Sequence, residues 1–359
     1  MTDVAAARAL LSAHDPLSQR QEELDDLAIE RMWQDLTRRV EVGTPPSVRG
    51  PVRRDPRTVR SAVASIVVLA LVAVGVAIAS GGGSSTRHYV ALQPLDYSRA
   101  LDPVRAAPVL DQLASAAQAQ PAAGTGTWYY LESASWSTFA GGDANARPAG
   151  MPTVVEQWIR DDGVQRVVTH SDLPAPAAGL DAWLRAGLPL TGGRVQTHTG
   201  TAAAGQFPKQ LSTDPATLED QLLTAEVGSS ARGAPGAVPR SEELIAAVKD
   251  LRAQRAMTPA LQAAVLRMLA AQPSIVSLGT ATDRLGREAQ AVGLDSSTSG
   301  LPTRHVLLFD PTTGELLGAE DILTKSAGQL GVPIPSVISY VIYVRDGLVR
   351  SDTSVPPPL

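Results

Sequence analysis

The chain has 359 residues, 44% of them hydrophobic, and a formal net charge of -5 at pH 7. This composition can build at least one sizeable core and excludes an intrinsically disordered chain, and the acidic balance argues against direct nucleic-acid binding. Cysteine is absent, which excludes disulfides, thiolate zinc sites, iron–sulfur clusters and a cysteine nucleophile.

Residues 1–45 contain two helical patterns, the second over about residues 17–40. On a helix, the large apolar side chains of the second pattern fall within roughly 100° of one another, and Gln34 lies on the opposite side. A segment this short has no core of its own, so the apolar stripe needs the first helix, the membrane surface or a partner protein. The candidate partner-binding residues are Ile29, Met32, Trp33, Leu36 and Val40.

An uncharged aliphatic run occupies residues 62–79. About eighteen apolar residues in a helix come close to the ~30 Å hydrocarbon core of a bilayer. We therefore expect one transmembrane helix over residues 61–80, preceded by a juxtamembrane linker over residues 46–60 whose prolines cannot continue a helix. The alternatives are a buried core helix and a signal peptide cleaved near residues 77–79.

Arginines set the expected orientation of this helix. Five of them precede the apolar run, whereas residues 80–89 contain only Arg87. By the positive-inside rule, residues 1–45 stay in the cytoplasm and the chain beyond the span is extracytoplasmic, which predicts a single-pass protein of the cell membrane. The topology-determining residues are Arg49, Arg53, Arg54, Arg57 and Arg60.

Residues 81–99 begin with a Gly/Ser run and are expected to form a flexible tether. Residues 100–359 are expected to form the extracytoplasmic domain, starting with a helix over residues 100–120. Aromatic and β-branched residues then indicate strands. Residues 140–152 read as a loop, and residues 171–210 favour no element. The predicted strands are residues 127–136, 154–160 and 164–170, the last two joined by a hairpin turn at residues 161–163.

A block of helices follows, opened by Asp214, by a capping Ser241 and by Thr258. The C-terminal part then returns to strands. Strand runs on both sides of a helical block predict an α+β domain whose antiparallel sheet is covered on one face by helices. The predicted C-terminal strands are residues 289–294, 304–310, 315–321 and 337–346, and turns are expected at residues 283–286 and 311–314.

Several short motifs occur in a fixed order: W-Y-x-L-E at 128–132, W-x-R-x-D-G at 158–163, LSTDPATLEDQL at 211–222, TPALQAAVLRMLA at 258–270 and LLFDPTTGELLGAE at 307–320. With the arginine-flanked span, this order resembles the actinobacterial single-pass membrane proteins often encoded beside extracytoplasmic-function sigma factors. The resemblance covers nearly all of the outer region and implies a layout like that of transmembrane anti-sigma factors. In strand and helix order, the outer domain is also similar to the lipoprotein-carrier half-barrel of periplasmic regulators of anti-sigma factors.

Candidate reactive residues are scattered. His14, His88, His170, His198 and His305 have no spacing that would place two metal ligands on one helix face, and no nucleophile elbow, P-loop or dinucleotide-binding motif occurs. We therefore predict no metal site, no cofactor and no enzymatic activity.

Two groups of side chains stay open to another interpretation. The carboxylates Asp161 and Asp162 with Glu132 or Glu156 are an acid/base set in one interpretation and solvated turn residues in the other. The aromatic side chains are core residues in one interpretation and line a pocket for a lipid or apolar peptide in the other. These aromatic residues are Trp128, Tyr129, Tyr130, Trp136 and Trp158.

These observations support a regulatory or sensor protein in the lipid bilayer, with a cytoplasmic sigma factor as the partner of the inner helices. The alternative is a membrane-tethered module that binds a lipid or a lipoprotein segment and has no cytoplasmic signalling role. A third class, an extracytoplasmic hydrolase, has no nucleophile–base motif to support it.

Overall fold

The computed structural model describes residues 92–121, 124–139, 149–171, 194–201, 207–227, 238–298 and 300–357. The predicted cytoplasmic helices, the arginine-rich linker, the span at residues 61–80 and the first part of the tether lie outside these residues. Among the residues that are described, no helix has both the length and the apolar character needed to cross a membrane.

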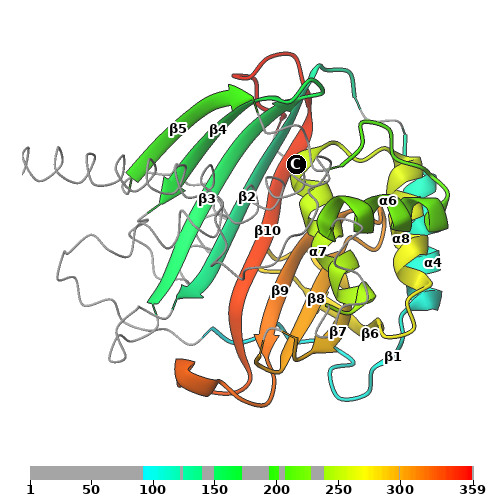
Figure 1. Cartoon of the computed structure of the whole chain (residues 1–359), viewed down its shortest axis with the longest axis vertical. Helices are drawn as coiled ribbons and strands as arrows, with labels where there is room; N and C mark the ends of the chain where they lie inside the picture. Colours follow the sequence, from blue (N-terminus) through cyan, green and yellow to red (C-terminus); the bar gives the residue numbers. More distant parts are fainter. Residues whose placement is uncertain are drawn as a thin grey trace, which may run out of the picture. The chain divides into compact units, whose positions relative to one another are not determined.

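The strands in this part of the chain form one ten-stranded antiparallel sheet (Figure 1). Its order is β1-β6-β7-β8-β9-β10-β2-β3-β4-β5, so the last strand, β10, joins the early strands β2–β5 to the late strands β6–β9. The strands are β1 (Val104–Arg105), β2 (Trp128–Phe139), β3 (Ala149–Arg160), β4 (Val164–Ser171), β5 (Arg194–Thr201), β6 (Val276–Thr282), β7 (Glu288–Ser296), β8 (Thr303–Phe309), β9 (Leu316–Leu323) and β10 (Ser336–Val349).

The helices of the described residues lie together over one side of this sheet (Figure 1). Proline in the first turn starts α4 and α8, where a missing N–H costs nothing. Thr258 caps α8, since its Oγ1 accepts a hydrogen bond from the N–H of Leu261 at 3.2 Å. The helices are α4 (Ala107–Gln118), α6 (Pro215–Val227), α7 (Arg240–Gln254) and α8 (Pro259–Ala270), with a short 3₁₀ turn η1 (Gly328–Leu330).

The larger core lies between these helices and the sheet face that they cover, which we call the helix face. Leu110 of α4, Leu222 of α6 and Leu266 of α8 are fully buried there. They belong to one cluster with Tyr129 of β2 and Phe309 of β8. Burial of each such side chain stabilises the fold by about 1.5–3 kcal/mol, so this cluster holds the helices on the sheet.

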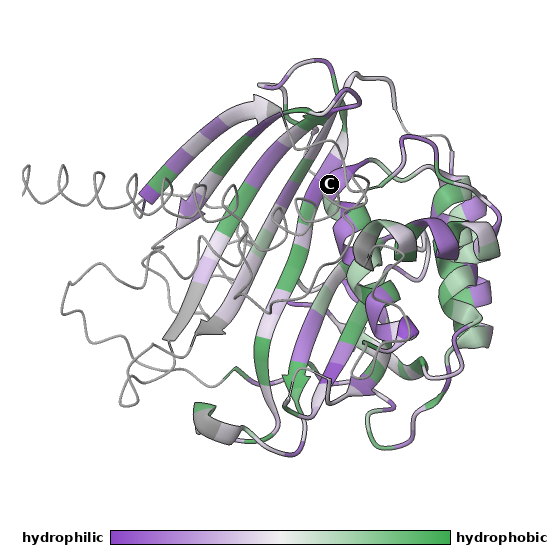
Figure 2. Cartoon of the chain, in the orientation of Figure 1, coloured by the Kyte–Doolittle hydropathy of each residue, from purple (hydrophilic) through white to green (hydrophobic). Residues whose placement is uncertain are grey.

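The other side of the sheet, the opposite face, has its own buried clusters, which contain no residue from the described helices. Trp136 and Tyr340 stack there with ring centroids 6.2 Å apart, and Tyr130 meets Trp158 edge-on at 5.0 Å. In Figure 2, hydrophilic and hydrophobic residues follow one another along the strands. Because successive side chains point to opposite faces, the strands contribute to both cores.

Residues 92–97, which the sequence assigns to the tether, lie against the opposite face. The N–H of Val337 donates to the carbonyl of Leu92 at 2.9 Å, and the hydroxyl of Tyr97 donates to Glu320 at 2.6 Å. Both Leu92 and Tyr97 are buried. The described domain therefore begins by residue 92 and not at residue 100.

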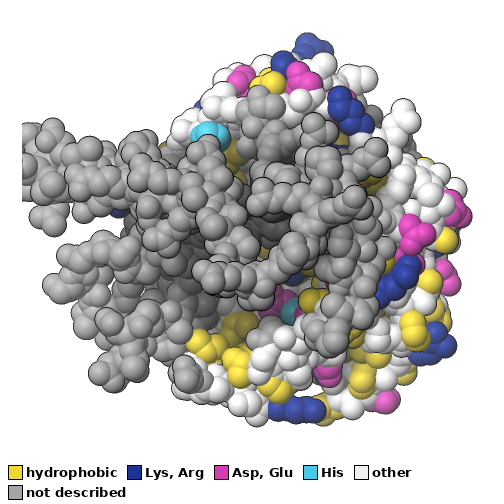
Figure 3. Space-filling model, in the orientation of Figure 1, with side chains coloured by type: hydrophobic (Ala, Val, Ile, Leu, Met, Phe, Trp, Pro, Cys, Tyr) yellow, Lys and Arg dark blue, Asp and Glu magenta, His cyan; other side chains and the backbone are white. Residues whose placement is uncertain are grey.

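The fold class predicted from sequence, an α+β domain with an antiparallel sheet, is confirmed. The hairpin at residues 161–163 is also confirmed: Gly163 has φ 89°, and its N–H donates to the carbonyl of Arg160 at 2.9 Å. The predicted cap at Ser241 is wrong, because α7 begins at Arg240 after Pro239, and the Ser241 hydroxyl accepts a hydrogen bond from Ser274 instead. On the surface that Figure 3 colours, acidic and basic side chains are interspersed.

Candidate functional site

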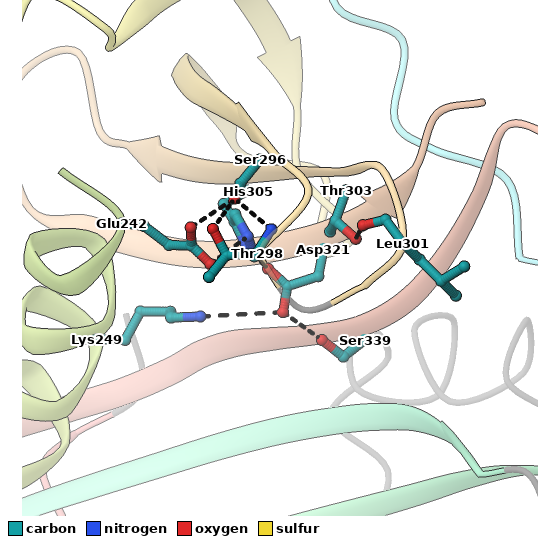
Figure 4. A network of polar contacts seen from close by, with 9 residues as sticks. All are labelled: Glu242, Lys249, Ser296, Thr298, Leu301, Thr303, His305, Asp321 and Ser339. Atoms are coloured by element: carbon teal, nitrogen blue, oxygen red, sulfur yellow. Dashed lines mark hydrogen bonds and ion pairs between the residues drawn. The ribbon is translucent and has the colours of Figure 1, made fainter. Parts of the chain in front are cut away.

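A row of polar side chains crosses three neighbouring strands on the helix face. His305 of β8 and Ser339 of β10 each lie directly opposite Asp321 of β9 in the antiparallel register. The Nδ1 atom of His305 is 2.7 Å from Oδ1 of Asp321, and the hydroxyl of Ser339 donates to Oδ2 at 2.7 Å. Asp321 is thus held from both sides within the sheet (Figure 4).

Helix α7 supplies two charged side chains to this row. Glu242 and Lys249 are two helical turns apart and so lie on the same side of α7. Oε1 of Glu242 is 3.6 Å from Nε2 of His305, and Nζ of Lys249 is 4.0 Å from Oδ2 of Asp321. Ser296 of β7 donates to Glu242 at 2.5 Å. The network therefore connects α7 to four strands, as Figure 4 shows.

Asp321 is ionised in this setting. Burial alone raises the pKa of its carboxyl, but the Lys249 ammonium and the contact with His305 lower it more, with a contribution from Ser339. The pKa of Asp321 therefore lies well below its ordinary value. An ionised carboxylate only accepts hydrogen bonds, so the Nδ1 atom of His305 carries a proton.

The other ring nitrogen of His305 faces a second carboxylate. Nε2 is buried and has no hydrogen-bond partner among the described residues, while the Glu242 carboxylate faces it at 3.6 Å. His305 therefore lies between the carboxylates of Asp321 and Glu242.

The two serine hydroxyls of this network are hydrogen-bonded to carboxylates. The hydroxyl of Ser339 donates to Asp321, and that of Ser296 donates to Glu242. Each hydroxyl thus orients a carboxylate of the network.

A second polar cluster lies on the opposite face, where sequence analysis considered an acid/base set. Glu132 and Glu156 are directly opposite each other on β2 and β3. The hydroxyl of Tyr130 is 2.9 Å from Glu156 and 3.4 Å from Glu132, and Arg345 donates to Glu132 at 2.8 Å. Nε2 of His170 lies 3.5 Å from Glu156. Burial, with both carboxylates nearby, raises the pKa of Tyr130 well above its usual value, so its hydroxyl stays a donor.

The two aspartates proposed for that set lie elsewhere. Asp161 and Asp162 form the tip of the hairpin between β3 and β4, and Asp162 pairs with Arg160 at 2.7 Å. The hydrogen bonds from Arg160 and from the backbone of Val164 lower the pKa of Asp162 to about 2. These are turn residues, while Glu132 and Glu156 meet in the sheet.

The other candidates from sequence are placed as follows. Tyr129 is buried on the helix face, where its hydroxyl donates to the carbonyl of Arg252 at 3.2 Å. Tyr130, Trp136 and Trp158 are buried in the clusters of the opposite face, as core residues. The candidate partner-binding residues, the topology-determining arginines, His14 and His88 lie outside the described residues.

The described part of the chain contains no group of three or more His, Asp or Glu side chains arranged to hold a metal ion. No protein-family profile matches the chain, and no curated protein matches it significantly in sequence.

Proposed function

We propose that this chain is a single-pass membrane protein with a regulatory or sensing role. In this proposal, residues 1–45 lie in the cytoplasm, residues 61–80 cross the bilayer, and the α+β domain lies outside. The uncharged run of residues 62–79 and the arginines before it support the topology.

The observation that carries the proposal is the set of contacts that fixes residues 92–97, which follow the expected transmembrane helix in the chain, to the sheet. Glu320 accepts hydrogen bonds from Tyr97 and from the guanidinium of Arg284, and Arg284 also donates to the carbonyl of Gln93 at 3.2 Å. Glu320 and Arg284 are both buried. Because residues 92–97 are fixed to the sheet by a buried ion pair, a change in the sheet would move the segment that leads to the span. A passive anchor needs no such connection.

The cytoplasmic partner in this proposal is a sigma factor. Its expected contact is the apolar stripe that contains Trp33, which has no core of its own to cover it. The resemblance of the motif order to proteins encoded beside extracytoplasmic-function sigma factors supports this choice.

The finer likeness to a lipoprotein-carrier half-barrel is also a proposal. It is supported by the insertion of α6–α8 between two runs of antiparallel strands, and by β10, which joins these runs into one sheet. The helix face, however, is filled by side chains of the chain itself, among them Leu110, Leu222, Leu266 and Phe309. This packing favours the regulatory role over lipid carriage between helices and sheet.

A cross-linking experiment in cells tests the partner. A photoactivatable amino acid replaces Trp33 in the full-length chain, and the matched control carries it in place of Gln34, on the other side of the same helix. We expect a sigma factor to cross-link from position 33 and much less from position 34. Equal yields, or no cross-link from either position, would contradict the anti-sigma role.

A further inference from the structure

The C-terminal residues fold back over the opposite face of the sheet. After β10 the chain turns, with the N–H of Ser354 donating to the carbonyl of Ser351 at 3.2 Å, and residues 352–357 then run over the sheet. Figure 1 shows this red segment at the end of the sheet near β2–β4. From residue 353 to residue 357, exposed and half-buried residues alternate. We call residues 351–357 the tail.

Three side chains from three strands hold the tail by its main chain. Arg166 of β4 donates to the carbonyl of Asp352 at 3.0 Å, and the indole N–H of Trp158 on β3 donates to the carbonyl of Ser354 at 2.6 Å. Arg345 of β10 donates to the carbonyl of Pro356 at 3.3 Å. Asp352 lies in the turn, whereas Ser354 and Pro356 follow it, and their carbonyls have the two-residue spacing of one side of an extended peptide.

The donors are held in place by contacts within the sheet. The guanidinium of Arg166 lies over the Trp158 ring at 4.6 Å, and the ring of Trp158 packs edge-on against Tyr130. Arg345 is fixed by Glu132 at 2.8 Å. These contacts do not involve the tail, so the surface is preformed for a peptide chain.

One position in the floor of this surface accommodates a proline ring. A Cβ atom on Gly347 of β10 would lie 3.2 Å from Cγ of Pro356, closer than an ordinary van der Waals contact. The absence of a side chain at residue 347 therefore provides the space for Pro356. An indole N–H that binds a carbonyl beside a proline ring is a common way to recognise extended, proline-containing peptides.

We propose that this surface, formed by Trp158, Arg166, Arg345 and Gly347, is a recognition site for an extended, proline-containing segment of a partner protein, and that the tail occupies it in cis. The contacts are made to main-chain carbonyls and to one proline ring, so they do not depend on the side chains at the exposed positions 353, 355 and 357. A partner segment of the same form can replace the tail. The inference does not depend on the proposed topology.

The first test follows the tail in the full-length chain. Because cysteine is absent, Val355→Cys gives a single site for a spin label at an exposed position. The probe is a synthetic peptide with the sequence of residues 350–359 in which Thr353, Val355 and Pro357 are replaced by alanine. A tail on a short connection has an effective concentration on the order of 1 mM, so we expect the label to become mobile at roughly 1–10 mM peptide. An unchanged spectrum at 10 mM would overturn the proposal.

The second test measures binding directly in a chain that ends at residue 350. We expect a fluorescent form of the same peptide to bind this chain, and Trp158→Phe, which removes the indole N–H, to weaken binding about tenfold. The matched control is Trp128→Phe on the same face, where the ring lies under Arg160 at 5.1 Å. It should bind normally. Equal affinities for both variants, or no binding by the shortened chain, would overturn the proposal.

Tail exchange between two copies is the competing arrangement. It would produce a dimer of the intact chain that disappears on removal of the tail, and such a dimer would overturn the assignment to a partner protein. If the shortened chain does not fold, the spin-label experiment still decides the proposal, because it uses the intact chain.

Discussion

Tyr97 and Glu320 are separated by 223 positions in the chain, yet the tyrosine hydroxyl donates to the carboxylate at 2.6 Å on the opposite face of the sheet. Burial raises the pKa of Tyr97 well above its usual value, and the Glu320 charge adds to this effect. The tyrosine therefore stays protonated and remains a donor. Arg284 balances the buried charge of Glu320.

Removal of one charge from the buried Glu320–Arg284 pair should strongly destabilise the fold. We expect Glu320→Gln to lower the free energy of unfolding by about 3–5 kcal/mol, because it removes the negative charge that the buried Arg284 guanidinium contacts. Denaturant unfolding of the purified full-length chain, followed by circular dichroism, measures this. The control is Asp295→Asn, which breaks a pair with Arg304 whose aspartate is 60% exposed, and should cost about 0–1 kcal/mol. Equal losses for the two variants would contradict the account.

The polar network around Asp321 predicts that the free energy of unfolding depends on pH. The pKa of Asp321 is lowered in the folded chain, so its charge stabilises the fold fully above the unfolded-state pKa of about 3.9. That stabilisation is lost as the pH falls from there toward the folded-state pKa. We expect the difference in unfolding free energy between wild type and Asp321→Asn to be constant at neutral pH and to shrink below about pH 4. Denaturant titrations between pH 3 and pH 7 measure it, and a difference that grows on acidification would contradict the ionised state of Asp321.

Alanine substitutions at two glycines with positive φ distinguish the cost of backbone strain from the cost of a steric clash. Gly300 has φ 92° and open space around a Cβ, whereas Gly314 has φ 68° and a Cβ there would lie 2.7 Å from the carbonyl of Leu113 in α4. We expect Gly300→Ala to cost about 1 kcal/mol, for the left-handed backbone alone. Gly314→Ala should cost clearly more, because α4 must shift. Thermal unfolding of both variants checks this, and equal melting temperatures would show that the turn at Gly314 can move away from α4.

The spacing of apolar residues and the positions of turn-forming residues were sufficient to predict the fold class. The strands β2, β4, β8, β9 and β10, the later part of β3 and the three helices between β5 and β6 follow clear apolar periods and Pro or Gly boundaries. The start of β3 was not predicted, because the strand begins at Ala149, inside the expected loop over residues 140–152. By contrast, β5 has the sequence RVQTHTGT and lies at the edge of the sheet with mostly exposed side chains. A polar edge strand has no buried face to give it a period, so the sequence carries no signal for it.

The His305–Asp321 contact could not be predicted from the hairpin that joins β8 and β9. Beside the turn, Phe309 pairs with Leu316, and the same register continued along the strands would place His305 opposite Glu320. A bulge between Leu308 and Phe309 shifts the pairing by one residue, so His305 lies opposite Asp321. A shift of one residue exchanges the two faces of a strand. Glu320 therefore lies on the opposite face with Tyr97, and Asp321 lies on the helix face.

The proposed topology places the α+β domain outside the cell membrane and residues 1–45 in the cytoplasm. Because the chain has no cysteine, single substitutions report directly on the side of the membrane. Leu101→Cys places a thiol at a fully exposed position in the domain, and Ser12→Cys places one in the N-terminal segment. Each full-length variant is treated in intact spheroplasts with a membrane-impermeant maleimide. We expect Leu101→Cys to be labelled in intact spheroplasts and Ser12→Cys only after lysis, whereas labelling of Leu101→Cys only after lysis would contradict the claim.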